Sequence, residues 1–299
     1  MAVPTFNPAK AKVILPAPGK AETGDGDTMR LDLPFRLVSV DTPEKSNVGG
    51  KPAVAQKRLD AALEVLGELS GRSGVPSGFA DYFAPRIADG GAVRHYAAAE
   101  EATNQLRKLR AETTTGAKGK ARELAVIPAG EVVDGNGRML AYVAPYLTKA
   151  ERDRLPVTSR KRRTFNLSLV AEGWAASFPI WPSFPSRRTD LDAFLDAAGT
   201  AWRRGKGNWA GGNKAALLTG YEFRALIKIG RARLDGILQS DGTRREATSR
   251  DFLSAFERRC VDRAGVNHGR FGFVAVPHGD RLWSWTQKAA GELQDYLGA

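Results

Sequence analysis

Short runs of alternating hydrophobic and polar residues within the first 150 residues predict β-strands. Three such runs, residues 11–17, 28–33 and 35–40, lie near the N-terminus. Two more, residues 122–130 and 138–147, flank the sequence VVDGNGR, in which Asp-Gly and Asn-Gly are typical of a tight β-hairpin turn. We therefore expect five strands, of which the last two form a hairpin.

Helical periodicity replaces strand alternation in four other stretches. Leucines recur at helical spacing in residues 53–69, and residues 96–112 consist mostly of good helix formers. Residues 166–175 and 189–205 continue the pattern, and the second begins with a threonine cap and ends in arginines. This order predicts an α+β fold with a mainly β core, a five-stranded Greek-key barrel of the oligonucleotide-binding type with packed helices.

The length of 299 residues suits one large domain or two ordinary ones. We expect the barrel domain to span residues 11–209, with an inserted helical segment at about 51–94. Residues 210–299 then form a C-terminal extension or a small domain. Its pattern predicts helices over residues 220–238 and 249–265, followed by a strand pair and a terminal helix.

The charge of the chain favours a polyanionic partner. Forty-five lysines and arginines oppose 33 aspartates and glutamates, which leaves a formal charge of +12. The cations gather in residues 158–165 and 202–209, the second run holding Trp202 and Trp209. Two interpretations stay open here: the cations and indoles bind phosphates and bases, or the indoles belong to the core and the cations to a solvated face.

Several classes of protein are disfavoured. With Cys260 as its one cysteine, the chain has no intrachain disulfide and no cysteine-based zinc site. No apolar run approaches the length of a membrane span, so we expect no membrane association. No signal peptide is visible, which predicts a cytoplasmic location for the sequence as written and leaves export open.

Two distant segments carry carboxylates and arginines in a pattern that indicates chemistry. The first supplies three acids, an arginine and a threonine: Asp27, Arg36, Asp41, Thr42 and Glu44. The second supplies Arg138, just after the hairpin turn. Oxygen ligands suit a hard cation such as Ca²⁺ or Mg²⁺, paired arginines suit a phosphate, and a remaining carboxylate suits a general base. Taken singly, each residue also has a structural interpretation, such as a strand-end turn or an ion pair.

Together these segments resemble the staphylococcal nuclease (thermonuclease) family. The sequences DGDT and FRLVSVDTPE are similar to the family's metal and catalytic segment, and DGNGRMLAYV is similar to its catalytic hairpin. NLSLVAEGWA resembles the helix that follows, and AWRRGKGNW resembles the end of the last helix. The resemblance covers about residues 12–209, with a large interruption.

The resemblance implies a calcium-dependent nuclease and assigns its parts. One Ca²⁺ ion would be held by the side chains of Asp27 and Asp41 and by the backbone carbonyl of Thr42. Glu44 would position or deprotonate the attacking water. Oxygen ligands and a free carboxylate are the groups that such a reaction needs.

The same resemblance assigns Arg36 and Arg138 to the scissile phosphate, where they stabilise the charge that develops on it. Hydrolysis would cleave the bond between phosphorus and the 5′ oxygen and leave 3′-phosphate ends. The expected substrates are DNA and RNA, with single-stranded or breathing regions preferred. The alternative is a catalytically inactive module that only binds nucleic acid, but the retained acids and arginines favour the enzyme.

The chain departs from the family pattern in three places. Gly135 and Asn136 stand where the family often has a Lys-Tyr pair, so we expect a terminal-phosphate contact to be lost. Pro179 and Trp181 stand at the positions of base-stacking tyrosines, and Trp181 is expected to stack on a base. We expect the inserted residues 51–94 to cover one side of the cleft and shape substrate access.

Overall fold

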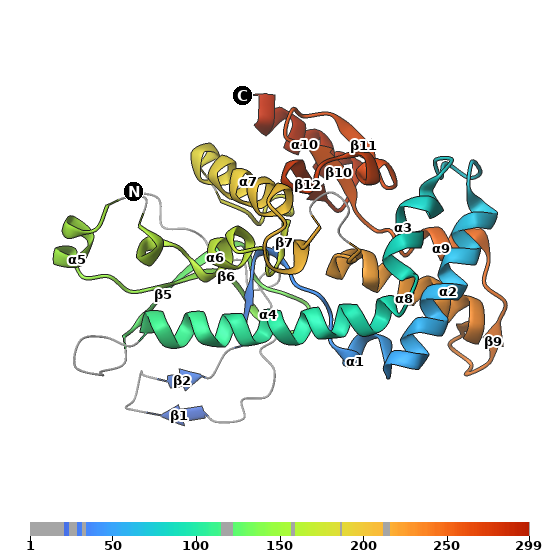
Figure 1. Cartoon of the computed structure of the whole chain (residues 1–299), viewed down its shortest axis with the longest axis horizontal. Helices are drawn as coiled ribbons and strands as arrows, with labels where there is room; N and C mark the ends of the chain where they lie inside the picture. Colours follow the sequence, from blue (N-terminus) through green and yellow to red (C-terminus); the bar gives the residue numbers. More distant parts are fainter. Residues whose placement is uncertain are drawn as a thin grey trace.

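A computed structural model gives the arrangement of most of the chain (Figure 1). It describes residues 21–23, 29–31, 34–114, 122–156, 159–185, 187–211 and 216–298. The described part is a mixed α/β fold in which helices hold more residues than strands. The strand expected at residues 11–17 and the candidate ligand Asp27 lie outside the described residues.

The hairpin expected around DGNGR is confirmed, and it builds the main sheet. β5 (Leu124–Val133) and β6 (Met139–Pro145) pair antiparallel and are joined by a short turn. β3 (Phe35–Leu37) pairs with β6 in parallel, so the strand order is β3-β6-β5. Arg36 lies within β3 and Arg138 directly precedes β6, so the two candidate arginines come from neighbouring strands.

The single strand expected over residues 35–40 is divided in two. Ser39 adopts a left-handed backbone with a φ of 60°, a conformation that interrupts a regular strand. After this break, β4 (Ser39–Asp41) leaves the main sheet and pairs antiparallel with β7 (Ala176–Phe178). Residues 38–40 are all buried, so the simple two-sided alternation predicted for this run is wrong.

The other strands form small separate sheets. Their bounds are β1 (Ala21–Thr23) with β2 (Met29–Leu31), β8 (Ile237–Leu238) with β9 (Arg244–Arg245), and β11 (Asn267–Gly269), β10 (Arg259–Asp262) and β12 (Arg281–Ser284) in that order. β2 lies within the strand expected at residues 28–33. The described strands do not close a barrel, and the five-stranded barrel stays a prediction.

Four helices confirm the periodicity of the sequence: α2 (Pro52–Leu69), α4 (Gly91–Thr114), α6 (Phe165–Ala171) and α7 (Arg188–Arg203). The other α-helices of the described residues are α1 (Ser46–Gly49), α3 (Phe79–Ile87), α5 (Lys149–Arg154), α8 (Gly220–Asp235), α9 (Ser249–Leu253) and α10 (Gln287–Gly298). The terminal helix and the helix near residue 220 are as expected.

The helix predicted over residues 249–265 is wrong beyond its first turns. α9 ends at Leu253, and β10 follows between two partner strands. Cys260 and Val261 of β10 are fully buried opposite Trp283 and Leu282 of β12. Burial in the sheet therefore overrides the local helical pattern.

The inserted helices share one hydrophobic core with the C-terminal region. Leu59 and Phe79 of the insertion lie in the same buried cluster as Leu226 of α8 and Phe273 near the C-terminus. α2 and α8 approach so closely that a Cβ at Gly230 would meet the Arg58 carbonyl oxygen at 1.8 Å. In Figure 1, the long helix α4 runs from this helical group to the side of the molecule that holds β5 and β6.

Candidate functional site

The structure brings Arg36 within electrostatic reach of Asp41 and of Arg138. Burial lowers the pKa of Arg36, Asp41 opposes that shift, and the charges of Arg138 and Arg224 add to it. The Arg36 guanidinium is therefore within electrostatic reach of the other two arginines and of Asp41. Two segments about one hundred residues apart in the sequence therefore lie near each other, and the roles assigned to their residues stay a prediction.

Asp134, in the hairpin turn, orients Arg138 and was not among the predicted site residues. Its Oδ2 atom accepts hydrogen bonds from Arg138 Nε at 2.9 Å and from Arg138 Nη2 at 2.6 Å. Burial opposes ionisation of Asp134, but hydrogen bonds from the Arg138 side chain and from backbone N–H groups outweigh it and lower the pKa. The signal for this role was the Asp-Gly turn four residues before the arginine.

Asp41 is buried at the end of β4, and both of its carboxylate oxygens are engaged. Oδ2 accepts a hydrogen bond from the backbone N–H of Tyr221 at 2.6 Å. Oδ1 accepts one from Arg224 Nη2 at 2.9 Å. Both partners belong to α8, which follows the predicted barrel domain in sequence. The sequence interpretation assigned no role to this helix.

Arg224 also binds Glu44 and so bridges the two acids. Its Nη1 atom donates to Glu44 Oε1. Burial disfavours the charged guanidinium, but Asp41 and Glu44 more than compensate, and the pKa of Arg224 is raised above its ordinary value. Arg224 therefore remains a cation, located between the proposed metal ligand and the proposed base.

His95 of α4 fixes the loop that carries Glu44. The backbone N–H of Glu44 donates to His95 Nε2 at 2.8 Å. The imidazole stacks on Phe223 of α8, with 3.9 Å between ring centroids and 5° between planes. Burial, and next the charge of Arg224, lower the pKa of His95 to about 3, so Nε2 is unprotonated and accepts this bond at neutral pH.

Thr42, the proposed carbonyl ligand, lies against the first residue of α8. A Cβ at Gly220 would meet the Thr42 carbonyl oxygen at 2.4 Å and Asp41 Oδ1 at 2.8 Å. Only a glycine allows α8 to start this close to the acid loop. All three proposed site groups of this loop are therefore in contact with α8 or with its side chains.

A fourth guanidinium lies in the same electrostatic environment. Burial lowers the pKa of Arg258, Tyr221 opposes the shift, and Arg224 and Asp41 act on it in opposite directions. The Arg258 guanidinium lies 4.1 Å from the ring centroid of Trp285. Together with the groups above, four guanidinium groups here oppose three carboxylates, a balance that suits an anionic ligand.

The described residues do not offer a free set of metal ligands in this arrangement. Their oxygen chemistry suits a hard cation. However, Asp41 has both oxygens engaged, the Thr42 carbonyl lies against α8, and Asp27 is outside the described residues. Within the part of the chain that the structure describes, no cluster of three or more acids, histidines or cysteines is placed to hold a metal ion.

Trp181, the candidate base-stacking residue, lies in an aromatic group that includes none of the predicted acids. Its ring centroid is 5.4 Å from that of Phe184 and 5.3 Å from that of Tyr296, and its indole N–H donates to Glu292 at 3.2 Å. It lines a cavity of about 870 Å³ together with two arginines of the basic run 159–164. The cavity could accept an aromatic group beside a phosphate.

The other two tryptophans of the basic region have a structural role. Trp202 is 7% exposed and Trp209 is 3% exposed, and the two pack on each other in a small core. Of the two interpretations left open for residues 202–209, the core assignment of the indoles is the one confirmed.

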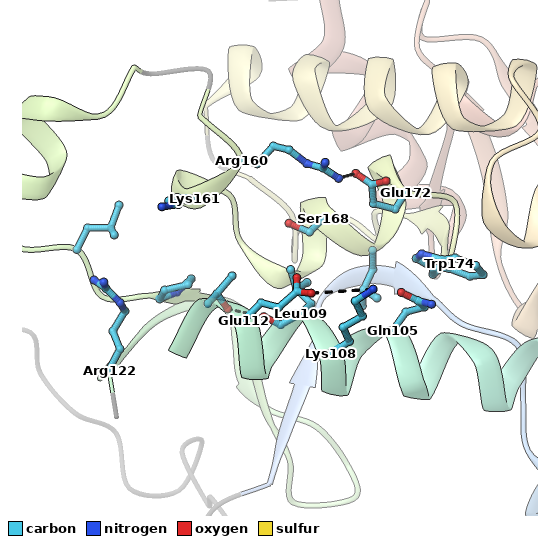
Figure 2. A pocket seen from close by; sticks show the side chains of 14 residues that line it. Gln105, Lys108, Leu109, Glu112, Arg122, Arg160, Lys161, Ser168, Glu172 and Trp174 are labelled. Atoms are coloured by element: carbon cyan, nitrogen blue, oxygen red, sulfur yellow. Dashed lines mark hydrogen bonds and ion pairs between the residues drawn. The ribbon is translucent and has the colours of Figure 1, made fainter. Parts of the chain in front are cut away.

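A second basic cavity, of about 610 Å³, lies between α4 and α6 (Figure 2). Its cations are largely paired: Arg122 with Glu151 at 2.8 Å, and Arg160 with Glu172. Lys161, which also lines the cavity, makes no ion pair with any described residue. None of the predicted site residues lines this cavity, so it is separate from the acid and arginine cluster.

One comparison with known proteins bears on this arrangement. A family model described as staphylococcal nuclease homologue matches residues 34–211. No curated protein and no solved structure matches the chain. Among the described helices, none is both long and apolar enough to cross a membrane. The match includes Arg36, Asp41, Glu44 and Arg138, whereas Arg224 lies beyond its end.

Proposed function

Because the chain belongs to the staphylococcal nuclease homologue family, we propose that it is a nuclease that hydrolyses phosphodiester bonds in DNA and RNA. The observation that carries this proposal is the convergence of two arginines from neighbouring strands with Asp41 and Glu44. A strongly positive chain supports a nucleic-acid substrate. The nuclease domain would comprise residues 11–209, with the five-stranded barrel as its core.

In this proposal, Arg36 and Arg138 bind the scissile phosphate. Asp134 holds Arg138 in place before substrate arrives, so less side-chain entropy is lost on binding. The Arg36 side chain is partly buried, which strengthens its interaction with a developing negative charge. These contacts would act on the phosphate whichever base is attached to it, which agrees with a substrate range of DNA and RNA.

Glu44 is the proposed general base. One carboxylate oxygen binds Arg224, and the other makes no hydrogen bond within the described part of the chain. That second oxygen can take a proton from water. The hydrogen bond from the Glu44 backbone to His95 holds the loop in place during the transfer. The proposed products carry 3′-phosphate ends.

The family resemblance implies one Ca²⁺ ion, with Asp27, Asp41 and Thr42 as the proposed ligands. When bound, the ion would supply positive charge beside the phosphate. In the described arrangement, Arg224 and the start of α8 engage Asp41 and Thr42, so these contacts must open before the ion can bind.

Trp181 is the proposed base-stacking residue, and single-stranded or breathing regions are the proposed preferred substrates. Its cavity also presents Arg162 and Arg163, which could bind neighbouring phosphates. The inserted segment is proposed to shape substrate access, and it can do so indirectly through α8. The insertion packs on α8, and α8 contacts the acids.

A second candidate function is nucleic-acid binding without cleavage. The observation in its favour is that Arg224 neutralises both Asp41 and Glu44. A site locked in that state would keep its arginines for phosphate binding and lose its metal and its base.

One experiment separates the two functions. The full chain is incubated with single-stranded DNA, double-stranded DNA and RNA, with Ca²⁺ or with a chelator, and cleavage and binding are measured in parallel. Glu44→Gln should lower the cleavage rate by about 10²- to 10⁴-fold and leave binding intact. Glu64→Gln, on the exposed face of α2, is the matched control and should change neither. Binding without metal-dependent cleavage by the unaltered chain would refute the nuclease proposal in favour of a binding module.

A further inference from the structure

Arg224 lies outside the family match and yet makes the closest charged contacts of the two acids. Its guanidinium spans from Asp41 Oδ1 to Glu44 Oε1, and its side chain is 31% exposed against 1% for Asp41. A guanidinium between two carboxylates occupies the position in which a cation would bridge them. This chain therefore provides its own positive charge at the acid pair.

The position of α8 is set by contacts that do not depend on Arg224. Thr219 and Glu222 form a capping box at its start, with hydrogen bonds of 2.8 and 3.2 Å. Glu222 Oε1 also accepts a hydrogen bond from Tyr82 at 2.7 Å and pairs with Arg281 at 3.3 Å. The start of α8 is thus tied to the insertion and to β12, and Arg224 is presented to the acids by a rigid support.

Two features prevent a divalent cation from binding while these contacts are present. The missing Cβ of Gly220 lets α8 approach the Thr42 carbonyl and Asp41 Oδ1, so a ligand between them and α8 would have to displace the helix start. The surrounding groups already include the guanidiniums of Arg36 and Arg138. A divalent cation added while Arg224 remains would therefore face strong like-charge repulsion.

We propose that Arg224 is a built-in counter-ion that competes with the divalent cation for Asp41 and Glu44, so that the C-terminal region sets the metal affinity of the site. This inference rests on the proposed function, since it concerns the ion of that reaction. Arg224 neutralises the acids while no ion is bound, and an ion binds only as Arg224 withdraws. Arg224 is thus a positioning residue for the acids.

The test measures Ca²⁺ binding to the full chain by titration calorimetry, without substrate. Arg224→Gln removes the competing charge and should bind Ca²⁺ at least about tenfold more tightly than the unaltered chain. Arg224→Lys keeps a cation and should stay closer to the unaltered chain than Arg224→Gln does. Arg233→Gln, which removes an exposed arginine of the same helix paired with Glu68, is the matched control and should show no change. Equal or weaker Ca²⁺ binding by Arg224→Gln would overturn the proposal.

Circular dichroism and thermal unfolding of each variant establish that it is folded. If Arg224→Gln does not fold, Gly220→Ala decides the matter. Its Cβ would lie 2.4 Å from the Thr42 carbonyl oxygen, 2.8 Å from Asp41 Oδ1 and 3.1 Å from Arg224 Nη1, so it separates α8 and Arg224 from the acids without changing any charge. Tighter Ca²⁺ binding by Gly220→Ala supports competition, and unchanged or weaker binding refutes it.

Failure of this proposal is distinguishable from failure of the nuclease proposal. Cleavage by the unaltered chain is measured separately and needs no Arg224 variant. If the unaltered chain cleaves nucleic acid and all variants bind Ca²⁺ with the same affinity, the proposed function stands and the proposed competition is refuted. If neither the unaltered chain nor Arg224→Gln binds Ca²⁺, the competition is refuted whatever the cleavage assay shows.

Discussion

Two ionic clusters meet the start of α8, and each pairs an arginine with a glutamate. The site cluster comprises Asp41, Glu44 and Arg224, and the core cluster comprises Tyr82, Glu222 and Arg281. In the core cluster, the side chains of Arg281 and Glu222 are 4% and 1% exposed. In the site cluster, those of Arg224 and Glu44 are 31% and 22% exposed.

The clusters differ in how completely their groups are satisfied. Both oxygens of Glu222 are bonded, Oε1 to Tyr82 and Arg281, and Oε2 to the Thr219 N–H. Glu44 has one oxygen without a hydrogen bond among the described residues, and the charges of Arg36 and Arg224 act on each other near this cluster. A closed, balanced ion pair holds segments together, whereas a half-open and unbalanced one can still take a ligand.

Among the substitutions that test this difference, the largest expected effect is a loss of stability when the core cluster is changed. Glu222→Gln leaves Arg281 buried without its counter-charge, which should lower the free energy of unfolding by about 3–5 kcal/mol. Urea unfolding measures it. Glu68→Gln breaks the exposed pair with Arg233 and should cost less than about 1 kcal/mol. Similar losses in the two variants would contradict the structural role of the core cluster.

The second largest expected effect is a loss of cleavage activity when Arg138, near the site cluster, is replaced. Arg138→Gln should lower the cleavage rate by about 10²- to 10³-fold, or about 3–4 kcal/mol, because a donor to the developing charge is lost. Steady-state kinetics on single-stranded DNA measure it, and stability should change little because the pair with Asp134 is partly exposed. Asp134→Asn, which loosens Arg138 but keeps it, should give a smaller loss. If Asp134→Asn is as inactive as Arg138→Gln, Asp134 does more than orient the arginine.

The smallest expected effect concerns the buried histidine that accompanies each cluster. His95 holds the Glu44 loop, and His278 lies 3.5 Å from the Tyr82 hydroxyl and stacks on Trp202. Burial lowers the pKa of both, that of His95 to about 3 and that of His278 well below its ordinary value. Both are therefore neutral in the folded chain and take up protons on unfolding below about pH 6.5.

The sign of the pH dependence follows from these lowered pKa values. The stabilising contribution is fully present above about pH 6.5 and is lost as the pH falls toward 3, because only the unfolded state binds the proton. When the pH is lowered from 7 to 5, the protonation of each histidine in the unfolded state should reduce the free energy of unfolding by about 1–2 kcal/mol. Urea unfolding of His95→Gln and His278→Gln at both pH values should show a smaller drop than the unaltered chain. An equal drop in all three would contradict this account.

Much of the local structure was predictable from the sequence. The Asp-Gly and Asn-Gly turn and the leucine periodicity of residues 53–69 act over short distances, so the hairpin and α2 formed as expected. Residues 35–40 and 249–265 did not follow their local patterns. The left-handed Ser39 and the buried pairing of β10 with β12 depend on partners far along the chain.

By itself, the sequence determined the residue types of the candidate site and the two distant segments that carry them. The motifs around Asp41 and Arg138 are short and continuous, and the family match covers both. Only the tertiary structure decided what surrounds the acids. Arg224 lies 180 residues after Glu44 in a segment without a motif, and it reaches the acids because α8 packs on the insertion and starts with a glycine against Thr42. Such a contact depends on how helices pack through a shared core. A local pattern of charges or hydrophobic residues does not predict that packing.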